Sequence, residues 1–519
     1  MKRPGDSSMS DRRRWRASAR AADDQPVARV TYSEMIAAHR DLPGPALLAG
    51  PDAWTWPQLL RLATSAARWL DGLGVPAGAP VAALLITNPG AIALTLAGAA
   101  TGRPVAPLGP RLTERELTPC VRGIAAEHLI VEPEYAAIGE RVASAAGVRF
   151  VPLPEFAESR DVDLPTPGMK DLATILHTSG TTGLPKPVRM TQRTLAQRAI
   201  VNSALLRLRP SSVYVSASPF HHIAGWGNVA VALGAGATIL PFPRFTVEGW
   251  QALGRFGVTH GLLVPTMIDM LLDREALKID SLQVMQYGAA PIHPDTLRRA
   301  MAVLPGVAFA DIYGQTEGSP ITCLTPDDHL RAAGGREDLL QSVGRAVPGV
   351  ELRIEGPGSD GVGELLARAP HLFHYAADGW QHTGDLGWLD EEGYLCLVGR
   401  KGDMIIRGGE NVYPLEVEHV LTEHPAVADA AVVGVADQRL GETVKAYLVP
   451  ADADELPDIT ELRSFARERL AGFKVPALWE FTDSLPLNAN GKLVRATLIE
   501  HAARAVAADA PDPSSTLMA

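Results

Sequence analysis

The sequence predicts an α/β protein in two parts. From about residue 45 to residue 325, apolar strand-like runs alternate with helical patterns, which indicates layered α/β subdomains with parallel strands. From about Ser342 glycine becomes frequent and the apolar runs shorten, as in a small β-barrel or distorted sheet. Beyond Gly399, about a hundred residues carry their own strands and helices, enough for a smaller α+β C-terminal domain.

The elements of the first part follow from local patterns. Residues 56–73 have apolar side chains at helical spacing and end at Gly74, so they predict an amphipathic helix. Residues 81–85 and 105–108 are short apolar runs that predict buried strands on either side of an apolar helix at 91–100. Further strands are expected at 172–176, 239–241 and 261–265.

The second part has its own pattern of predicted helices and strands. Residues 414–421 begin an amphipathic helix, residues 427–435 and 443–449 alternate as strands do, and residues 459–470 predict another helix. We therefore expect a disordered basic tail at 1–28, an N-terminal domain at 29–399, a hinge at 400–403, a C-terminal domain at 404–505 and a disordered tail at 506–519.

Composition limits the class of protein. With 519 residues, 46% of them hydrophobic and 21% charged, the chain can bury a large core in two to four structural units. A net charge of -11 argues against a nucleic-acid binder, which would present a basic face. The three cysteines are far apart, which fits a reducing cytoplasm. The basic N-terminus lacks a following apolar stretch, and Asn88–Gly90 interrupt the run at 81–96, so neither a secretory signal nor membrane insertion is expected.

A hydroxyl- and glycine-rich stretch suggests phosphate binding. It contains Thr178, Ser179, Gly180, Thr181, Thr182, Gly183 and Lys186. Glycines let backbone N–H groups converge on an anion, hydroxyls add donors, and a lysine adds a positive charge. The lysine does not have Walker spacing and is followed by Pro187. A polar surface turn is the simpler alternative.

Six further segments join this loop in a fixed order. They are Phe-His-His-Ile-Ala-Gly-Trp at 220–226, Gly-Ala-Ala-Pro at 288–291, Tyr-Gly-Gln-Thr-Glu-Gly at 313–318, Thr-Gly-Asp-Leu-Gly at 383–387, Gly-Arg at 399–400 and Pro-Leu-Asn-Ala-Asn-Gly-Lys at 486–492. Together they make the chain resemble the adenylate-forming superfamily, which includes acyl-CoA synthetases, adenylation domains of peptide synthetases and firefly luciferase. The resemblance covers roughly residues 45 to 500.

The resemblance implies a set of nucleotide contacts. The implied ATP- and AMP-binding residues are Thr178, Ser179, Gly180, Thr181, Thr182, Gly183, Lys186, Gly288, Ala289, Ala290, Tyr313, Gly314, Asp385 and Arg400. Within this set the loop holds the β- and γ-phosphates, residues 288–291 form a wall against the adenine on which Tyr313 stacks, and Asp385 accepts the ribose hydroxyls. The acceptor-only carboxylate of Asp385 suits a diol. Taken singly, Tyr313 could be a core residue and Asp385 a turn residue.

The implied catalytic residues are Lys492, Thr316, Glu317 and His222. Glu317 would hold Mg²⁺, for which a carboxylate is a suitable hard ligand. Lys492 would bridge the α-phosphate and the substrate carboxylate and cancel their repulsion. A carboxylic acid would thus react with MgATP to give an acyl-AMP and pyrophosphate, and the thiol of CoA would then take the acyl group.

In this superfamily the C-terminal domain rotates between the two half-reactions. By resemblance, Gly402 is the hinge, and Gly408, Gly409, Glu410 and Lys474 line the path of the thiol. The acceptor could also be a carrier protein or an amine, and the activated anion could be an oxyanion such as nitrite. A non-catalytic nucleotide-binding protein and an oxidative, luciferase-like enzyme are the other classes. The chain is expected to be a monomer or a homodimer.

The acid is expected to be an aryl or short- to medium-chain acyl acid. Activators of α-amino acids carry an Asp near the position of His222, and this chain offers no such anion to an ammonium group. The expected pocket is lined by His221, His222, Gly225, Trp226, Tyr287, Gly288, Gly314 and Ile321. Two adjacent histidines could suggest a metal, but no third ligand has suitable spacing.

Four features depart from the superfamily pattern. Pro187 stands where glycine is usual, and proline removes a backbone donor. Gly402 stands where the pivot is usually Asp or Lys, His221 replaces a common aromatic residue, and the stretch between Tyr375 and Asp378 is short.

The hinge assignment predicts that Gly402→Pro traps one domain arrangement, because proline fixes φ where glycine allows rotation. Pyrophosphate exchange and CoA-dependent thioester formation, measured separately, should then respond unequally. Two half-reactions that both run at the wild-type rate would show that the hinge lies elsewhere.

Overall fold

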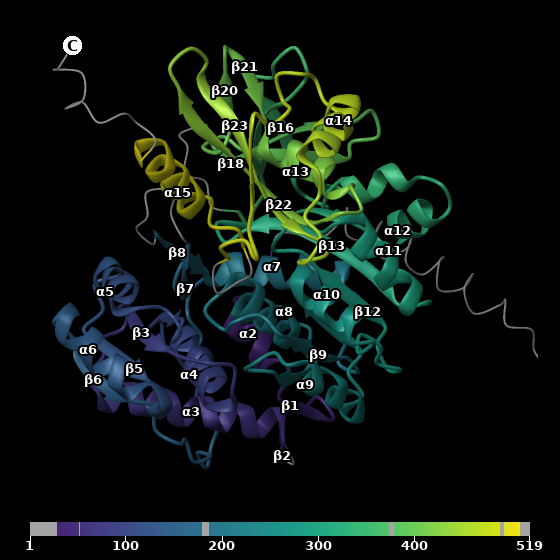
Figure 1. Ribbon diagram of the computed structural model, residues 1–519. Coiled ribbons are helices and arrows are strands. Elements are labelled where there is room, and N and C mark those ends of the chain that lie inside the picture. The colour runs from purple at the N-terminus through teal and green to yellow at the C-terminus, as the bar shows by residue number, and fades with distance from the viewer. Residues whose placement is uncertain (1–27, 51, 179–185, 373–377, 488–491, 509–519) are drawn as a thin grey trace, which may run out of the picture. The chain divides into compact units, whose positions relative to one another are not determined.

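The computed structural model describes residues 28–50, 52–178, 186–372, 378–487 and 492–508 (Figure 1). The chain divides into two compact units. The larger unit comprises Met1–Leu352, Ala367–Gln381 and Glu391–Leu395, and the smaller unit comprises Arg353–Leu366, His382–Asp390 and Cys396–Ala519. Each is described by itself below.

One sheet of the larger unit has six strands in the order β6-β5-β3-β4-β7-β8. Its strands are β3 (Val81–Leu84), β4 (Val105–Leu108), β5 (His128–Val131), β6 (Arg149–Pro152), β7 (Leu172–Thr178) and β8 (Lys186–Thr191). All neighbours are parallel except β7 and β8, which form an antiparallel hairpin at one edge. The strands expected at 81–85, 105–108 and 172–176 are therefore confirmed, and their apolar runs reflect burial on both faces.

A second sheet of nine strands has the order β15-β14-β13-β12-β11-β9-β10-β1-β2. Its strands are β1 (Pro45–Ala49), β2 (Asp52–Thr55), β9 (Val213–Ser216), β10 (Thr238–Pro241), β11 (His260–Leu263), β12 (Val284–Tyr287), β13 (Ala308–Gln315), β14 (Gly318–Leu324) and β15 (Arg345–Ala346). From β13 to β1 all neighbours are parallel, so the carboxyl ends of β9, β11, β12 and β13 lie at one edge.

Helices connect these parallel strands. They are α2 (Tyr32–Ala37), α3 (Trp56–Gly72), α4 (Pro89–Ala100), α5 (Glu114–Gly123), α6 (Ala136–Ala146), α7 (Gln192–Leu205), α8 (Asn228–Gly234), α9 (Val247–Ala252), α10 (Pro265–Asp273), α11 (Pro294–Val303) and α12 (Pro326–Ala333). The expected helix at 56–73 begins at Thr55, whose side chain caps it together with Gln58. The expected helix at 91–100 begins earlier, where the Asn88 side chain accepts from Ala91 N–H at 2.8 Å.

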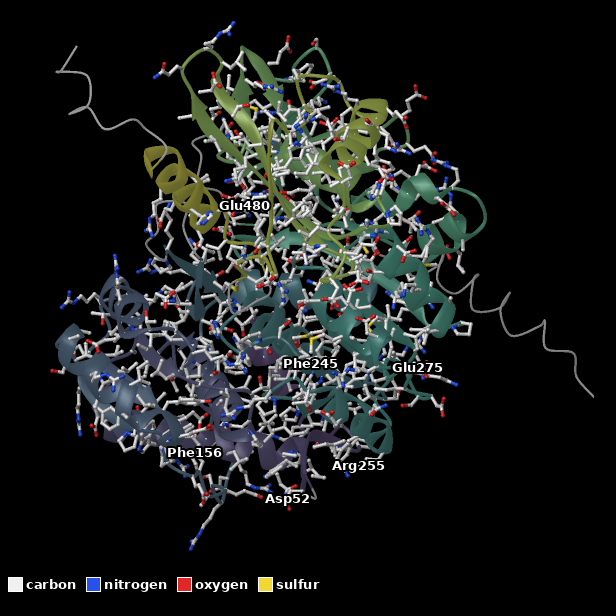
Figure 2. All side chains as sticks on the ribbon, viewed as in Figure 1. Asp52, Phe156, Phe245, Arg255, Glu275 and Glu480 are labelled. Carbon is white, nitrogen blue, oxygen red and sulfur yellow. The ribbon has the colours of Figure 1, made fainter. Side chains whose placement is uncertain are left out.

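Large apolar side chains fill the space between helices and sheets (Figure 2). Trp250 is completely buried, and its indole N–H donates to the Leu277 carbonyl at 3.1 Å. Phe156, labelled in Figure 2, packs edge to face on Trp69 with ring centroids 5.7 Å apart. In the described part of the chain, no helix is both long and apolar enough to cross a membrane.

The smaller unit contains a sheet in the order β21-β20-β23-β22, with β24 beside β23. Its elements are β20 (Ile405–Arg407), β21 (Glu410–Val412), α13 (Pro414–Thr422), β22 (Val427–Asp437), β23 (Gly441–Pro450), α14 (Ile459–Arg469), β24 (Leu478–Phe481) and α15 (Arg495–Ala508). The helices and strands expected between residues 414 and 470 are confirmed. On β24, Glu480 (Figure 2) pairs with Lys445 of β23 at 2.7 Å.

A four-stranded sheet stands where the small β-barrel was expected. Its strands, in the linear order β16-β17-β18-β19, are β16 (Glu351–Glu355), β17 (Gly363–Arg368), β18 (Gln381–Leu389) and β19 (Leu395–Arg400). Most of this sheet falls in the smaller unit, whereas the sequence placed it in the N-terminal domain. The expected domain limits and the hinge at 400–403 stay predictions.

Arg495, the first residue of the C-terminal helix α15, bonds this helix to the rest of the smaller unit. Arg495 donates to both carboxylate oxygens of Glu418 on α13, one of them at 2.8 Å, and to the Val432 carbonyl at 2.7 Å. Glu418 also accepts from Val432 N–H at 2.7 Å and is almost completely buried. Burial opposes the charge of Arg495, but the hydrogen bond to Glu418 outweighs it and raises the Arg495 pKa.

This arrangement predicts that Arg495→Ala destabilises the smaller unit by about 3 kcal/mol, because it leaves the buried Glu418 carboxylate without its cation. The matched control is Arg504→Ala on the same helix. Its exposed pair with Glu500 spans 3.9 Å, and exposed pairs are worth about 0.5 kcal/mol or less. Urea unfolding followed by circular dichroism compares the two, and equal midpoints would contradict the assignment.

Candidate active site

Several predicted nucleotide contacts lie at the carboxyl ends of two neighbouring parallel strands of the larger unit. Tyr287, the last residue of β12, is paired with Asp311 of β13. Gly288 and Ala289 follow with positive φ angles of 138° and 67°. A Cβ on Gly288 would lie 2.8 Å from an oxygen of Asp311, so glycine is required there for a close approach as well as for conformation. The segment 288–290 and Tyr313 are thus brought to one edge.

Thr316 and Glu317 form the turn of the next hairpin. Gln315 ends β13, Gly318 begins β14, and the two are paired across the turn. Both turn side chains are half-buried. A Cβ on Gly314 would lie 2.8 Å from the Ser319 Cβ, so the two strands touch closely at this point. The hairpin therefore carries the Thr316 hydroxyl and the Glu317 carboxylate in its turn, shortly after Tyr313 in the chain, as the motif order predicts.

The predicted phosphate loop also joins two strands. Thr178 ends β7 and Lys186 begins β8, and the two residues are paired. Ser179, Gly180, Thr181, Thr182 and Gly183 lie outside the described residues. The loop connects antiparallel strands, whereas a Walker loop connects a strand to a helix. Pro187 sits on the edge strand β8, and proline within sheets is largely confined to edge strands.

His221 and His222 lie where the two large sheets meet. They follow β9 in the nine-stranded sheet, and their rings are 3.9 Å apart. A Cβ on Gly109, which follows β4 of the six-stranded sheet, would lie 2.4 Å from the His221 ring. Burial, with the neighbouring charges of His222, His177 and Arg111, holds the His221 pKa well below its usual value, so this imidazole is neutral. Burial also lowers the His177 pKa to about 4.

The remaining residues of the expected acyl pocket are tightly packed. Gly225 and Trp226 belong to the π-helical segment η2 (Ile223–Gly227), and such segments are frequent at functional sites. A Cβ on Gly225 would lie 1.9 Å from the Pro219 carbonyl oxygen, so only glycine fits. The side chains of Trp226 and Ile321 are completely buried.

The side chain of Tyr287 lies in the core. The residue was expected to line the acyl pocket, and its ring packs against Phe309 and His329. The phenol donates to His329 Nε2 at 2.7 Å, because His329 Nδ1 lies 2.8 Å from the Thr325 carbonyl and must carry the proton. Burial lowers the His329 pKa to about 4, which keeps the ring neutral. Only the Tyr287 backbone remains available to a pocket.

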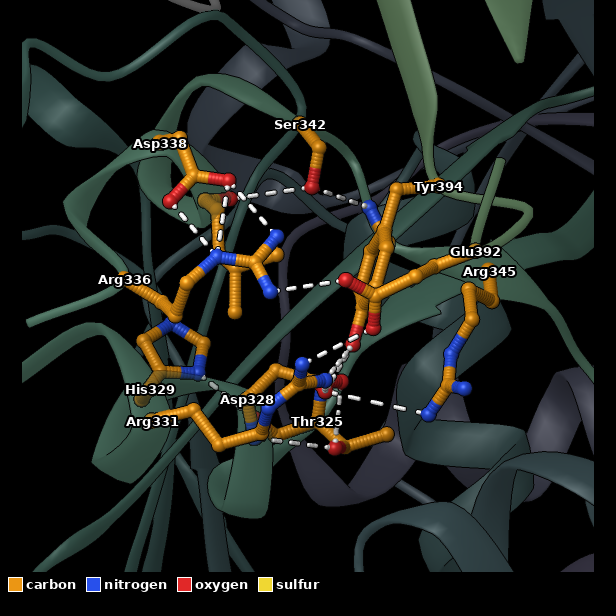
Figure 3. Close-up of polar contacts among 12 residues, drawn as sticks. Thr325, Asp328, His329, Arg331, Arg336, Asp338, Ser342, Arg345, Glu392 and Tyr394 are labelled. Atoms are coloured by element: carbon orange, nitrogen blue, oxygen red, sulfur yellow. Dashed lines mark hydrogen bonds and ion pairs between the residues drawn. The ribbon is translucent and has the colours of Figure 1, made fainter. Parts of the chain in front are cut away.

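His329 belongs to a polar cluster that sequence reasoning missed (Figure 3). On α12, Asp328 is buried, caps the helix through Thr325 and accepts from the Tyr394 hydroxyl, which lies 2.6 Å from an Arg331 guanidinium nitrogen. The Arg345 guanidinium stacks over the Tyr394 ring at 4.8 Å. These contacts hold helix α12 in place. His329 on this helix also bonds to Tyr287, the last residue of β12, and so holds the end of that strand.

The smaller unit holds a second group of predicted nucleotide contacts. Asp385 on β18 is buried, and Arg400 at the end of β19 donates to its carboxylate at 3.0 Å. Beside them, Glu364 of β17 accepts from Lys401 at 2.8 Å and from Gly384 N–H at 3.2 Å. Burial of Glu364 is outweighed by these contacts, which lower its pKa. Sequence reasoning missed Glu364, because its partners Lys401 and Gly384 are distant along the chain.

Lys492 follows a segment that lies outside the described residues. The ends of that segment are tied together, since Leu487 and Leu493 form a bridge and Val494 N–H donates to the Pro486 carbonyl at 2.8 Å. Three residues after Lys492, Arg495 makes the contacts with Glu418 described above. The base of the Lys492 loop is therefore fixed.

The predicted thiol path is assembled within the smaller unit. Gly408 and Gly409, with φ angles of 62° and 90°, form the two-residue turn between β20 and β21, and Glu410 follows. Arg407 donates to the Phe473 carbonyl at 2.6 Å, which brings this turn beside the segment of Lys474. Lys474 itself lies 2.7 Å from Glu416. The roles of these residues stay predictions.

Gly402 lies in the turn after β19. Met404 N–H donates to the Arg400 carbonyl at 3.1 Å across this turn. Gly402 is exposed, and a Cβ on it would meet no other atom within 4 Å. Neither packing nor a positive φ angle therefore requires glycine at this position.

Comparisons with known proteins agree with the motifs. The family model "AMP-binding enzyme" matches residues 36–375, and "AMP-binding enzyme C-terminal domain" matches residues 416–492. A fatty acid–[acyl-carrier-protein] ligase from Streptomyces coeruleorubidus is 34% identical, over 88% of this chain and 92% of the relative. An indoleacetate–CoA ligase from Aromatoleum aromaticum is 33% identical, over 89% of this chain and 96% of the relative. An amide bond synthetase from Marinactinospora thermotolerans has a similar structure, with a TM-score of 0.81, 29% identity and coverage of 91% and 99% of the two chains.

Asp311 gives the site a measurable pH dependence. Burial raises the pKa of its carboxyl to about 7, well above that of an unfolded chain. The resulting stability is fully present below about pH 4, the pKa of Asp in an unfolded chain, and is lost as the pH rises from there through 7. Asp311→Asn should therefore raise the melting temperature more at pH 8 than at pH 5, by on the order of a few degrees.

Thermal unfolding at the two pH values, without nucleotide, measures this difference. Asp52→Asn, on the exposed strand β2, is the matched control and should show no pH-dependent difference. An Asp311→Asn difference that is the same at pH 5 and pH 8 would contradict the raised pKa.

Proposed function

The chain belongs to the AMP-binding enzymes of the adenylate-forming superfamily, and from that premise we propose that it activates a carboxylic acid as acyl-AMP and transfers the acyl group to the thiol of CoA. The acid is an aryl or short- to medium-chain acyl acid without an α-amino group. The observation that carries the proposal is the meeting of the positive-φ backbone at 288–289, Tyr313 and the Thr316–Glu317 turn at one edge of the nine-stranded sheet.

The first half-reaction joins two anions. A carboxylate oxygen attacks the α-phosphorus of ATP in line, and pyrophosphate leaves. The backbone at 288–290 and the ring of Tyr313 hold the adenine, and Thr316 contacts the α-phosphate. Lys492, at the end of a loop whose base is fixed, supplies the positive charge that lets the two anions approach.

Glu317 fits a divalent cation, because its carboxylate lies in a tight turn next to a hydroxyl and is only half-buried. Bound Mg²⁺ would screen the charge of the triphosphate. In the smaller unit, Asp385 offers carboxylate oxygens to the ribose hydroxyls, and the bond from Arg400 holds that carboxylate in one orientation.

The neutral histidines support the choice of acid. An α-amino acid would need a buried anion for its ammonium group. His222 stands at the expected position of that anion, and the neighbouring ring of His221 is neutral. The backbone of η2, held in place by the buried Trp226, borders the proposed position of the acyl or aryl group.

The acceptor has a second candidate. The relative that loads an acyl-carrier protein and the similar amide bond synthetase favour a carrier-protein thiol or an amine as alternatives to CoA. The Gly408–Gly409 turn and Lys474 are the proposed path to whichever acceptor is used.

The experiment is ATP–pyrophosphate exchange across a panel of acids, followed by product analysis with CoA, an acyl-carrier protein or an amine. Lys492→Ala should lower exchange about 10²- to 10³-fold while nucleotide still binds, because the transition-state charge loses its partner. Lys278→Ala, an exposed lysine paired with Asp280, is the matched control and should exchange at the wild-type rate. Wild-type exchange by Lys492→Ala would overturn the role of Lys492, and no exchange with any acid would overturn the proposed activity.

A further inference from the structure

A buried arginine without an acidic partner lies beside the residues assigned to the acid. Arg198 is on α7 and is 4% exposed. Its guanidinium donates to the Gly227 carbonyl and to the Asn228 side-chain oxygen, the latter at 2.8 Å. Both acceptors are neutral. Among the described residues no carboxylate lies within ion-pair distance of Arg198, and its Nε–H has no hydrogen-bond partner.

The other titratable groups near Arg198 do not supply a negative charge. Burial raises the pKa of the phenols of Tyr32 and Tyr214, so both stay neutral. Burial lowers the pKa of His371 to about 4, so this ring is neutral and adds no competing cation. The pKa of Arg198 itself is lowered by burial to about 10, which leaves the guanidinium charged at neutral pH. A buried charge without compensation is costly and calls for a physical reason.

The position of Arg198 supplies that reason. Gly227 closes the η2 segment that contains Gly225 and Trp226. A Cβ on Gly227 would lie 3.3 Å from the Arg198 guanidinium. Asn228 also lies 3.4 Å from Gln286 of β12, two residues before the strained backbone at 288. The guanidinium therefore contacts the last residue of η2, the segment that is assigned to the acyl group.

A purely structural role would not need a charge at this place. The Gly227 carbonyl and the Asn228 side-chain oxygen could accept from a neutral donor. In other proteins, apolar side chains of similar volume often replace buried ion pairs without loss of stability. Guanidinium offers five N–H donors in a planar fork that matches a carboxylate. The described protein contacts use two of its nitrogens, so donors remain for a further acceptor.

We propose that Arg198 recognises a second, negatively charged oxygen group of the acid substrate, distal to the carboxylate that is activated. This inference rests on the proposed acid activation and narrows its substrate class to acids that carry two anionic groups. A distal carboxylate is such a group at neutral pH, whereas a distal phenol, with a pKa of about 10, is uncharged and serves as the polar comparison. Binding would supply the counter-charge that the described protein lacks around Arg198.

The test uses matched acids that differ only at the distal end: cinnamate, 4-hydroxycinnamate and 4-carboxycinnamate, with hexanoate and adipate as the aliphatic pair. Exchange gives kcat/KM for each acid, and calorimetry gives its affinity. The wild-type protein should prefer an acid with a distal anion. Arg198→Met should lower that preference about 10- to 100-fold, the range for losing a charged hydrogen bond, while keeping or improving use of the neutral acids.

Two further variants separate recognition from structure. Arg193→Met changes an exposed arginine on the same helix and should leave the preference unchanged. Arg198→Lys keeps the charge and should retain part of the preference. Without ligand, Arg198→Met removes an uncompensated buried charge but also leaves the Gly227 carbonyl and the Asn228 side-chain oxygen without their donor, so its melting temperature serves as the control for folding and its acid selectivity as the test of recognition.

Three outcomes would overturn the inference. The wild type could prefer the neutral acids, Arg198→Met could weaken all acids equally, or Arg198→Met could lower the melting temperature without altering selectivity. Failure of the proposed function looks different, because no acid would then support exchange. In that event calorimetry still measures the affinity of the wild type and of Arg198→Met for adipate and 4-carboxycinnamate. Equal affinities of the two proteins would overturn the role of Arg198.

Discussion

The parallel register of the nine-stranded sheet is the constraint on which the larger unit's site depends. Parallel neighbours end at the same edge, so the segments that follow β9, β12 and β13 meet there although they are far apart in sequence. His221 and Gly288 follow β9 and β12, and Tyr313 lies near the carboxyl end of β13. A slip of one residue between strands would turn every side chain to the opposite face and separate these groups.

Close backbone approach is the second requirement of this edge. Gly225, Gly288 and Gly314 each lie where a Cβ would meet another atom at less than 3 Å. The absence of side chains lets η2 approach the Pro219 backbone, the end of β12 approach β13, and β13 approach β14, and it leaves backbone groups available to a ligand. The buried contact between Tyr287 and His329 then holds the end of β12 against α12.

Charge is distributed differently in the two units. In the larger unit several titratable groups near the site are kept neutral by burial, as His221 and His177 are, and Asp311 is neutral through part of the physiological range. Arg198 stays charged although it is buried. In the smaller unit the candidate contacts are paired, with Arg400 on Asp385 and Lys474 on Glu416. The neutral histidines of the larger unit add no charge to the site, so the charge of the reactants is met by the few groups that remain charged.

The sequence by itself determined the local elements and the chemistry of the motifs. Apolar runs at 81–85 and 172–176 predicted strands because parallel strands are buried on both faces, and the ordered motifs identified the superfamily. Only the tertiary structure placed Tyr287 in the core, gave the four-stranded sheet in place of a barrel, and revealed Asp311, His329, Glu364 and Arg198. The importance of these residues comes from burial and from partners far along the chain, which periodicity and spacing cannot express.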